Sequence, residues 1–199
     1  DGFLYSGSAD QTVQKIDPSD MTQAGSSYTG HTGSVLAVTF ATDGFLYSGS
    51  GDNTLQKIDP SDMTQVTLPF NYGGHTSGIR GLTFGSDGFI YSGSDDNTVQ
   101  KIDPSNMTQV GSSYTGHTNF VNALTFGTDG FLYSGSADDT LQKIDPSDMT
   151  QVGSSYTGHV NDVIALTFGT DGFVYSGSRD DTVQKIDPST MTQVGSSYT

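Results

Sequence analysis

Four sets of one His, one Ser and one Asp recur along the chain at fixed spacing. In each set the Ser follows the His by 17 residues and the Asp follows the His by 21. The sets are His31, Ser48 and Asp52; His75, Ser92 and Asp96; His117, Ser134 and Asp138; and His159, Ser176 and Asp180. A hydrolase triad uses these three residue types. No Gly-x-Ser-x-Gly elbow surrounds these serines, and one active site does not need four copies, so we predict a structural network and no catalytic residues.

The Asp-rich turns are the remaining candidates for chemistry. The turn at residues 94–98 reads Ser-Asp-Asp-Asn-Thr, but no turn has the ligand spacing of an EF-hand. There is no Cys, no Cys/His cluster and no Gly-rich phosphate loop. The sequence therefore predicts no metal site, no cofactor and no enzymatic activity.

These residues sit in a unit that is repeated along the whole chain. The triplet Asp-Gly-Phe begins at Asp1, Asp43, Asp87, Asp129 and Asp171, so successive repeats are 42, 44, 42 and 42 residues apart. A period near forty is typical of units that bury a core only by stacking on their neighbours. We interpret residues 1–199 as a single repeat domain, and as part of a longer chain.

The last repeat shows the elements of the unit. Residues 163–168 are β-branched and apolar, and predict a buried strand. Further strands are predicted over 173–178, 182–187 and 192–199, separated by turns rich in Gly, Asp and Pro. No segment has a capped helical period. Four short antiparallel strands per repeat predict an all-β fold, a β-propeller of five four-stranded blades.

At these residues the chain resembles the WD-repeat propellers. Each Gly-His pair is followed by the turn Asp and, six residues later, by Ile-Asp, as at Gly30-His31, Asp52 and Ile58-Asp59. The resemblance implies that the His, Ser and Asp form a buried hydrogen-bonded set. The family has Trp where this chain has Ile, so the resemblance implies that the Ser loses a partner and needs another one, or water.

The sequence supplies one strand fewer than five complete four-stranded blades need. The chain begins at a second strand and stops after a fourth, which predicts a first blade without its innermost strand. Either five blades close a ring around this defective blade, or the chain is one segment of a longer array of blades.

In each repeat one Lys occupies a strand position that is usually apolar in the family: Lys15, Lys57, Lys101, Lys143 and Lys185. We expect these side chains to lie between blades and to pair with a neighbouring Asp.

The positions where the repeats disagree fall in two groups. One is the residue before the turn Asp, and the other lies two to five residues after the His. In a propeller both groups share one rim around the channel, the usual partner-binding face of the family. We predict these ligand-binding residues: Ser34, Leu36, Gly78, Arg80, Asp95, Phe120, Asn122, Asp162, Ile164 and Arg179. The irregular segment 66–74 in the second repeat adds two residues, and of a lateral contact and a bulge we favour the bulge.

Composition limits the partners. The net charge of −15 disfavours nucleic acid and anionic membranes, and no apolar run reaches the about 18 residues that would insert into a bilayer. We expect a protein or glycan ligand, with an extracellular or virion-surface setting such as an adhesin or tail fibre, or else the cytoplasm. Two alternatives are a multivalent lectin with one sugar site per blade, and a structural unit that self-associates through open blade edges.

Overall fold

A computed structural model describes residues 2–66 and 71–199, and the secondary structure in these residues is strand alone. Alternating large and small side chains favour β-strands. Gly or Asp in the turns ends each strand after a few residues. The fold is all-β, as predicted.

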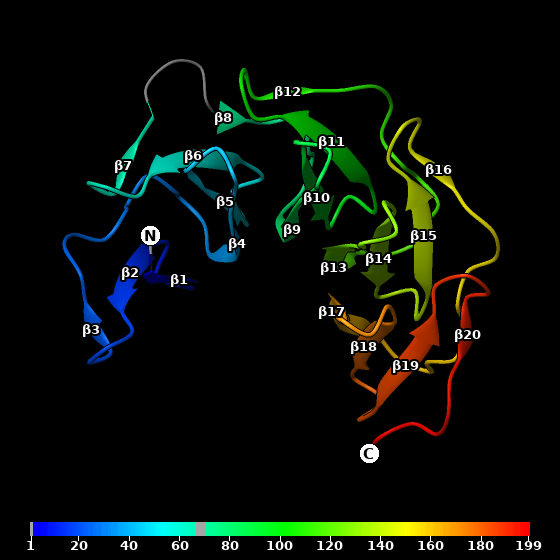
Figure 1. Cartoon of the computed structure of the whole chain (residues 1–199). Coiled ribbons are helices and arrows are strands. Elements are labelled where there is room, and N and C mark those ends of the chain that lie inside the picture. The colour runs from blue at the N-terminus through cyan, green and yellow to red at the C-terminus, as the bar shows by residue number, and fades with distance from the viewer. Residues whose placement is uncertain (1, 67–70) are drawn as a thin grey trace.

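The described residues form five antiparallel sheets in chain order (Figure 1). The first sheet contains β1 (Leu4–Gly7), β2 (Val13–Asp17) and β3 (Thr22–Gln23). The second contains β4 (Val35–Phe40), β5 (Leu46–Ser50), β6 (Leu55–Asp59) and β7 (Thr64–Gln65), with β8 (Asn71–Tyr72) pairing with β6. The third contains β9 (Ile79–Phe84), β10 (Ile90–Ser94), β11 (Val99–Asp103) and β12 (Thr108–Gln109). The fourth contains β13 (Val121–Phe126), β14 (Leu132–Ser136), β15 (Leu141–Asp145) and β16 (Thr150–Gln151). The fifth contains β17 (Val163–Phe168), β18 (Val174–Ser178), β19 (Val183–Asp187) and β20 (Thr192–Gln193).

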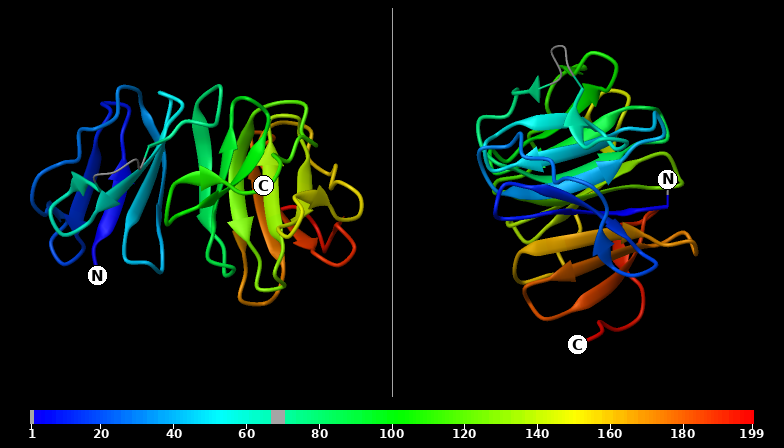
Figure 2. Two further views of the ribbon diagram at one scale, coloured as in Figure 1. Left: turned by 90° about the horizontal axis from the view of Figure 1, so that it is seen from above. Right: turned by 90° about the vertical axis from the view of Figure 1, so that its left-hand side faces the viewer.

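The sheets are the blades of a propeller. The innermost strands β4, β9, β13 and β17 line the centre, and β4 packs against β9, β9 against β13, and β13 against β17 (Figure 1). Figure 2 shows the blades from two further sides as twisted layers that stand next to one another. The first blade lacks its innermost strand, as predicted. The five blades form an arc that is open between the first blade and the fifth (Figure 1), so this structure does not close a ring around the defective blade.

The outermost strands are shorter than predicted. The strand expected over 192–199 is limited to Thr192–Gln193, because Gly195 has a φ of 76° that bends the chain away. Tyr198 then returns to pair with Val183 as an isolated bridge. In the second blade β8 makes the equivalent pairing, Tyr72 with Leu55, so it is not an additional blade strand. The predicted bulge at 66–74 includes residues 67–70, which lie outside the described residues.

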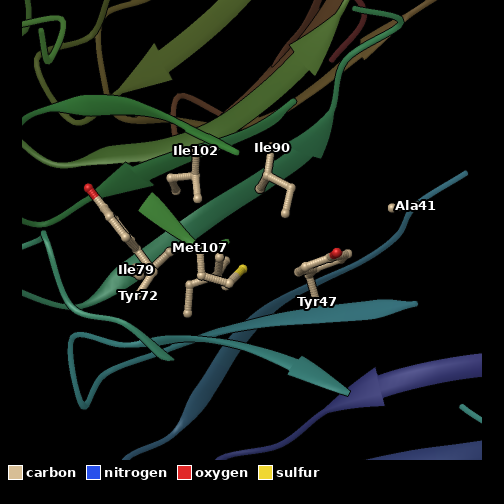
Figure 3. Close-up of a cluster of buried hydrophobic side chains, with 8 residues drawn as sticks. Ala41, Tyr47, Tyr72, Ile79, Ile90, Ile102 and Met107 are labelled. Atoms are coloured by element: carbon tan, nitrogen blue, oxygen red, sulfur yellow. The ribbon is translucent and has the colours of Figure 1, made fainter. Parts of the chain in front are cut away.

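Hydrophobic cores lie between blades and are built from two kinds of face. The face that a blade turns to the next blade, here the forward face, contributes Tyr47, Leu55 and Tyr72 in the second blade. The face that it turns to the previous blade, the back face, contributes Ile79, Ile90, Ile102 and Met107 in the third (Figure 3). The other three junctions repeat this pattern. The apolar positions of the repeat therefore stabilise stacking, as a repeat architecture requires.

A Lys side chain crosses each junction between blades. Lys101 Nζ lies 2.9 Å from Asp87 Oδ2 in its own blade and 2.9 Å from the Pro146 carbonyl oxygen of the next blade. It also lies 4.1 Å from the centre of the Phe89 ring. Lys57 and Lys143 make the same set of contacts. The predicted position of the Lys between blades and its predicted pairing with a neighbouring Asp are both confirmed here, and the Asp belongs to the same blade as the Lys.

Candidate functional site

The fourth blade shows how each His, Ser and Asp are joined. His117 Nδ1 lies 2.9 Å from Asp138 Oδ2, and His117 Nε2 lies 2.7 Å from Ser134 Oγ. A carboxylate only accepts, so Nδ1 carries the proton and Nε2 accepts from the Ser hydroxyl. This is the hydrogen-bond order of a hydrolase triad. However, Ser134 is 0% exposed and His117 4% exposed, so a substrate has no path to the hydroxyl.

The expectation that each Ser finds another partner, or water, in place of the Trp N–H stays a prediction, and the structure shows the contact of the Ser with the His. A hydroxyl has one donor, and the Ser uses it on His Nε2. No buried side-chain nitrogen or oxygen lacks a partner in the part of the chain that the structure describes. The structure adds a pair that the sequence reasoning missed: the Tyr114 hydroxyl donates to Gln142 Oε1, and Gln142 Nε2 lies 3.3 Å from both the Gly116 carbonyl oxygen and Thr140 Oγ1. The Tyr114 ring also meets the His117 ring edge-on at 6.1 Å.

The turn Asp is held in its charged form. Burial of Asp52 opposes ionisation, but hydrogen bonds from Thr54, the Thr32 amide and His31 outweigh it and lower the pKa of Asp52 to about 2. Burial is likewise outweighed at Asp138 and Asp180, whose pKa values are also lowered. In contrast, burial lowers the pKa of His75 in spite of its bond to Asp96. In the third blade the network therefore pairs a neutral imidazole with a carboxylate.

The two groups of variable positions meet on one rim, as predicted. The residue before each turn Asp donates its amide to the carbonyl of a variable residue after the His. The distances are 2.8 Å from Gly51 to Ser34, and 2.9 Å from Asp95 to Gly78, from Ala137 to Phe120 and from Arg179 to Asp162. In each complete blade the two variable positions are therefore direct neighbours.

Four variable residues share a feature of the backbone. Leu36, Arg80, Asn122 and Ile164 are each the second residue of an innermost strand, at the position where the pairing register shifts. A β-bulge of this kind leaves one residue unpaired and re-aims its side chain. These four residues and Arg179 line one open cavity of about 280 Å³, here called the channel mouth. Ser34, Gly78, Phe120, Asp95 and Asp162 do not line it.

Charged residues at the channel mouth are paired within the rim. Arg80 donates from Nε and Nη2 to the two carboxylate oxygens of Asp95, with Nη2 and Oδ2 3.1 Å apart. The Arg80 guanidinium also lies 5.3 Å from the centre of the Phe120 ring. Arg179 Nη1 lies 2.8 Å from Asp162 Oδ2. Sequence reasoning missed these pairs, although each Arg and its Asp occupy the two variable groups of the same repeat.

The channel mouth exposes both apolar and charged groups. Leu36 is 43% exposed, Ile164 is 45% exposed and the Arg179 side chain is 62% exposed. A guanidinium has five N–H donors, and Arg179 uses one of them on Asp162. Apolar contact and several hydrogen-bond donors are therefore offered at one place.

A second open cavity of about 370 Å³ lies at the opposite ends of the innermost strands. The positions that line it are identical or nearly identical from repeat to repeat: Thr42, Phe84, Gly85, Ser86, Phe126, Gly127 and Thr128. The sequence reasoning predicted no site there. No group of three or more potential metal ligands lies together in residues 2–66 and 71–199. Nor do these residues contain a helix long and apolar enough to cross a membrane.

Comparisons with known proteins agree with this architecture. A family model described as "WD domain, G-beta repeat" matches residues 23–59, 66–103, 108–145 and 150–187. Among solved structures, the WD40 β-propeller domain of Doa1 is similar over 92% of this chain, with a TM-score of 0.80 and 20% identity. This chain covers 60% of that structure. No protein among the curated sequences matches.

Proposed function

Because the chain belongs to the WD domain, G-beta repeat family, whose propellers are protein-interaction modules, we propose that its channel mouth binds a protein partner. One observation carries this proposal. The repeats are nearly identical, yet the bulged position of the innermost strand carries Leu, Arg, Asn or Ile, and these four residues converge on a single open cavity. Elsewhere in these strands the repeats exchange only Val, Ile and Leu, or Ala and Gly, so the large changes of size and charge within the strands are confined to the residues around the cavity.

The composition of the channel mouth indicates how a partner is held. Leu36 and Ile164 provide apolar contact area, and Arg179 provides unused N–H donors beside it. Arg and aromatic residues dominate binding energy at protein interfaces, and Phe120 stands against Arg80 at this rim. An apolar side chain of the partner would enter the cavity, while a neighbouring carboxylate or carbonyl oxygen would accept from Arg179.

A glycan ligand fits the channel mouth less well. A multivalent lectin needs one equivalent site per blade, whereas the four bulge positions carry Leu, Arg, Asn and Ile. An extracellular or virion-surface setting is part of the proposal and is supported by composition alone.

The proposal is tested with a random peptide library displayed on phage and selected on the purified chain. Selected peptides should lose at least about tenfold in affinity for Arg179→Ala, and essentially all affinity for the double variant Arg80→Ala, Phe120→Ala. Lys185→Ala removes the same charge from the fifth blade outside the channel mouth, and it should bind as the wild type does. Circular dichroism establishes that each variant is folded. Peptides that bind all variants equally would refute the channel mouth as the site.

A further inference from the structure

The lining of the channel mouth differs in charge from the rest of the molecule. The chain has a net charge of −15 and contains two Arg residues, Arg80 and Arg179. Both line this cavity, together with Leu36, Asn122 and Ile164, and none of the carboxylates that the structure describes does so. The cavity therefore presents two cations in a molecule that otherwise carries a large excess of anions.

The carboxylate partner of Arg80 is less accessible than Arg80 itself. Asp95 accepts from Nε and Nη2 of Arg80, and its side chain is 18% exposed against 36% for Arg80. Phe120 of the fourth blade lies against the same guanidinium, with its ring centre 5.3 Å away. The third and fourth blades, which supply these residues, each have a blade on either side (Figure 1). The guanidinium is therefore held in one place, and its carboxylate partner is set back from the cavity.

Both Arg residues keep N–H donors that a ligand can use. A guanidinium has five, of which Arg80 uses two on Asp95 and Arg179 uses one on Asp162. The planar fork of donors matches the geometry of a carboxylate or a phosphate group. The apolar residues of the lining displace water from around these donors, and a charge-assisted hydrogen bond is stronger where water is displaced. These features favour an oxyanion as the group that enters the channel mouth.

The net charge of the molecule limits which segment can carry this oxyanion. Repulsion from exposed Asp residues extends over about 8 Å at physiological ionic strength. One oxyanion inside the cavity meets the two Arg residues at hydrogen-bond distance, whereas further acidic residues beside it would meet an acidic surface. Basic residues in the same places would be attracted to that surface. The complementary segment therefore carries one anion among neutral or basic neighbours.

On the basis of the proposed function, we propose that the channel mouth binds one oxyanion, a carboxylate or a phosphate monoester, on a partner segment whose flanking residues are neutral or basic. The oxyanion accepts from the remaining N–H donors of Arg80 and Arg179. The carbon atoms of the same side chain pack against Leu36 and Ile164. The two Asp partners are positioning residues, because they hold the Arg side chains and do not touch the ligand.

The test compares two peptide libraries on phage that differ only in the central residue, which is Glu in one and Gln in the other. Both are selected on the purified 199-residue chain. The Glu library should give more binders, with Lys and Arg over-represented beside the Glu. The best Glu peptide should bind at least about tenfold more tightly than its Gln form, because a hydrogen bond to a charged group is about twice as strong as a neutral one.

A third synthetic peptide carries phosphoserine in place of the Glu and separates the two sources of the oxyanion. Tighter binding than the Glu peptide assigns the site to a phosphate monoester, and weaker binding assigns it to a carboxylate. Either result supports an oxyanion site as long as the Gln peptide binds more weakly than both.

One variant removes both guanidinium groups without changing the net charge. It combines Arg80→Gln, Asp95→Asn, Arg179→Gln and Asp162→Asn, so two cations and two anions are lost and the charge stays at −15. Long-range repulsion is then unchanged, and only the N–H donors of the cavity are missing. The Glu and Gln peptides should bind this variant within about twofold of each other, because neither meets a charged donor.

A matched control changes the charge away from the channel mouth. Asp62→Asn with Asp148→Asn replaces two exposed carboxylates at positions where the third repeat itself has Asn106. This control should keep the preference for the Glu peptide at about tenfold, because the lining of the cavity is intact. Circular dichroism of each variant shows that a lost preference is not loss of the fold.

Two results would overturn this inference. One is equal affinity of the wild-type chain for the Glu and Gln peptides. The other is a preference for Glu that survives in the variant without guanidinium groups, which would place the oxyanion elsewhere. In either case the proposed function still stands if the peptides lose affinity for the double variant Arg80→Ala, Phe120→Ala. If neither library gives a binder, both the oxyanion site and the proposed function are refuted.

Discussion

At the scale of single residues, the turn Asp is the centre of each complete blade. Asp138 accepts from the Thr118 amide at 3.0 Å, the Thr140 amide at 3.1 Å, Thr140 Oγ1 at 2.7 Å and His117 Nδ1 at 2.9 Å. These bonds tie the loop before the innermost strand to the tight turn between the second and third strands. The arrangement that resembles a catalytic triad thereby fixes the shape of the rim.

Removing this carboxylate should be costly for stability. Asp138→Ala leaves the buried His117 N–H and three further donors without their acceptor, so we expect a loss of about 3 kcal/mol or more in the free energy of unfolding, measured by urea denaturation. The matched control is Asp148→Ala, because Asp148 accepts only from the exposed Thr150. The control should lose about 1 kcal/mol or less. Equal losses in the two variants would contradict the structural role of the network.

The same network makes stability depend on pH. The pKa of His75 in the folded chain lies below its ordinary value, so the unfolded state binds protons more readily and stability should begin to fall below about pH 6.5. The pKa of Asp52 is lowered to about 2, so its contribution is complete above about pH 4 and is lost as the pH falls toward 2. Thermal melts should therefore show a shallow decline from pH 6.5 and a steeper one below pH 4. A melting temperature that is constant from pH 7 to pH 3 would refute this assignment.

At the scale of elements, the Lys between blades should contribute more inside the arc than at its end. Lys101→Met leaves the partly buried Asp87 without its cation and Pro146 without its donor, so we expect a loss of about 2–4 kcal/mol in urea denaturation. Lys185→Met removes an equivalent Lys that has no proline partner in the described chain, and it should cost clearly less. Adding Asp87→Asn to Lys101→Met should recover part of the loss. Equal effects of the two single variants would contradict a role across the junction.

Strands and turns were predictable from the sequence because their signals are local. The apolar run of β17 and the Gly-Thr-Asp-Gly turn after it are read within one repeat, and the His, Ser and Asp set follows from its fixed spacing. The outermost strand was predicted too long because a polar segment gave no sign of where Gly195 would end the pairing. Prediction missed the bulge at Arg80 because a bulge depends on the register between two strands. The contact of Tyr114 with Gln142 spans 28 residues, and spacing alone does not indicate it.

At the scale of the whole molecule, the sequence left closure of the ring open, and the structure explains why. Every junction has the same forward and back faces, so the residues of a repeat are equally compatible with any number of blades. Closure depends on the small rotation from each blade to the next, which no single residue encodes. The open arc follows from summing these rotations over five blades.

The charge distribution gives the whole molecule a dependence on salt. Four of the five Lys lie at blade junctions, Lys185 pairs with Asp171, and both Arg pair with Asp at the rim, so few cations balance the net charge of −15 on the outside. The Debye length falls from about 10 Å at 0.1 M to about 3 Å at 1 M, which screens repulsion between exposed Asp residues while the partly buried Lys–Asp pairs are screened less. We therefore expect the melting temperature to rise by about 5 °C or more between low salt and 1 M NaCl.

Replacing NaCl by sucrose separates screening from general exclusion of a cosolute, because sucrose carries no charge. Screening of surface repulsion predicts that most of the rise occurs at the lower NaCl concentrations, where the Debye length changes most. A profile that stays flat from low to molar NaCl would show that the excess of Asp serves solubility and does not destabilise the fold.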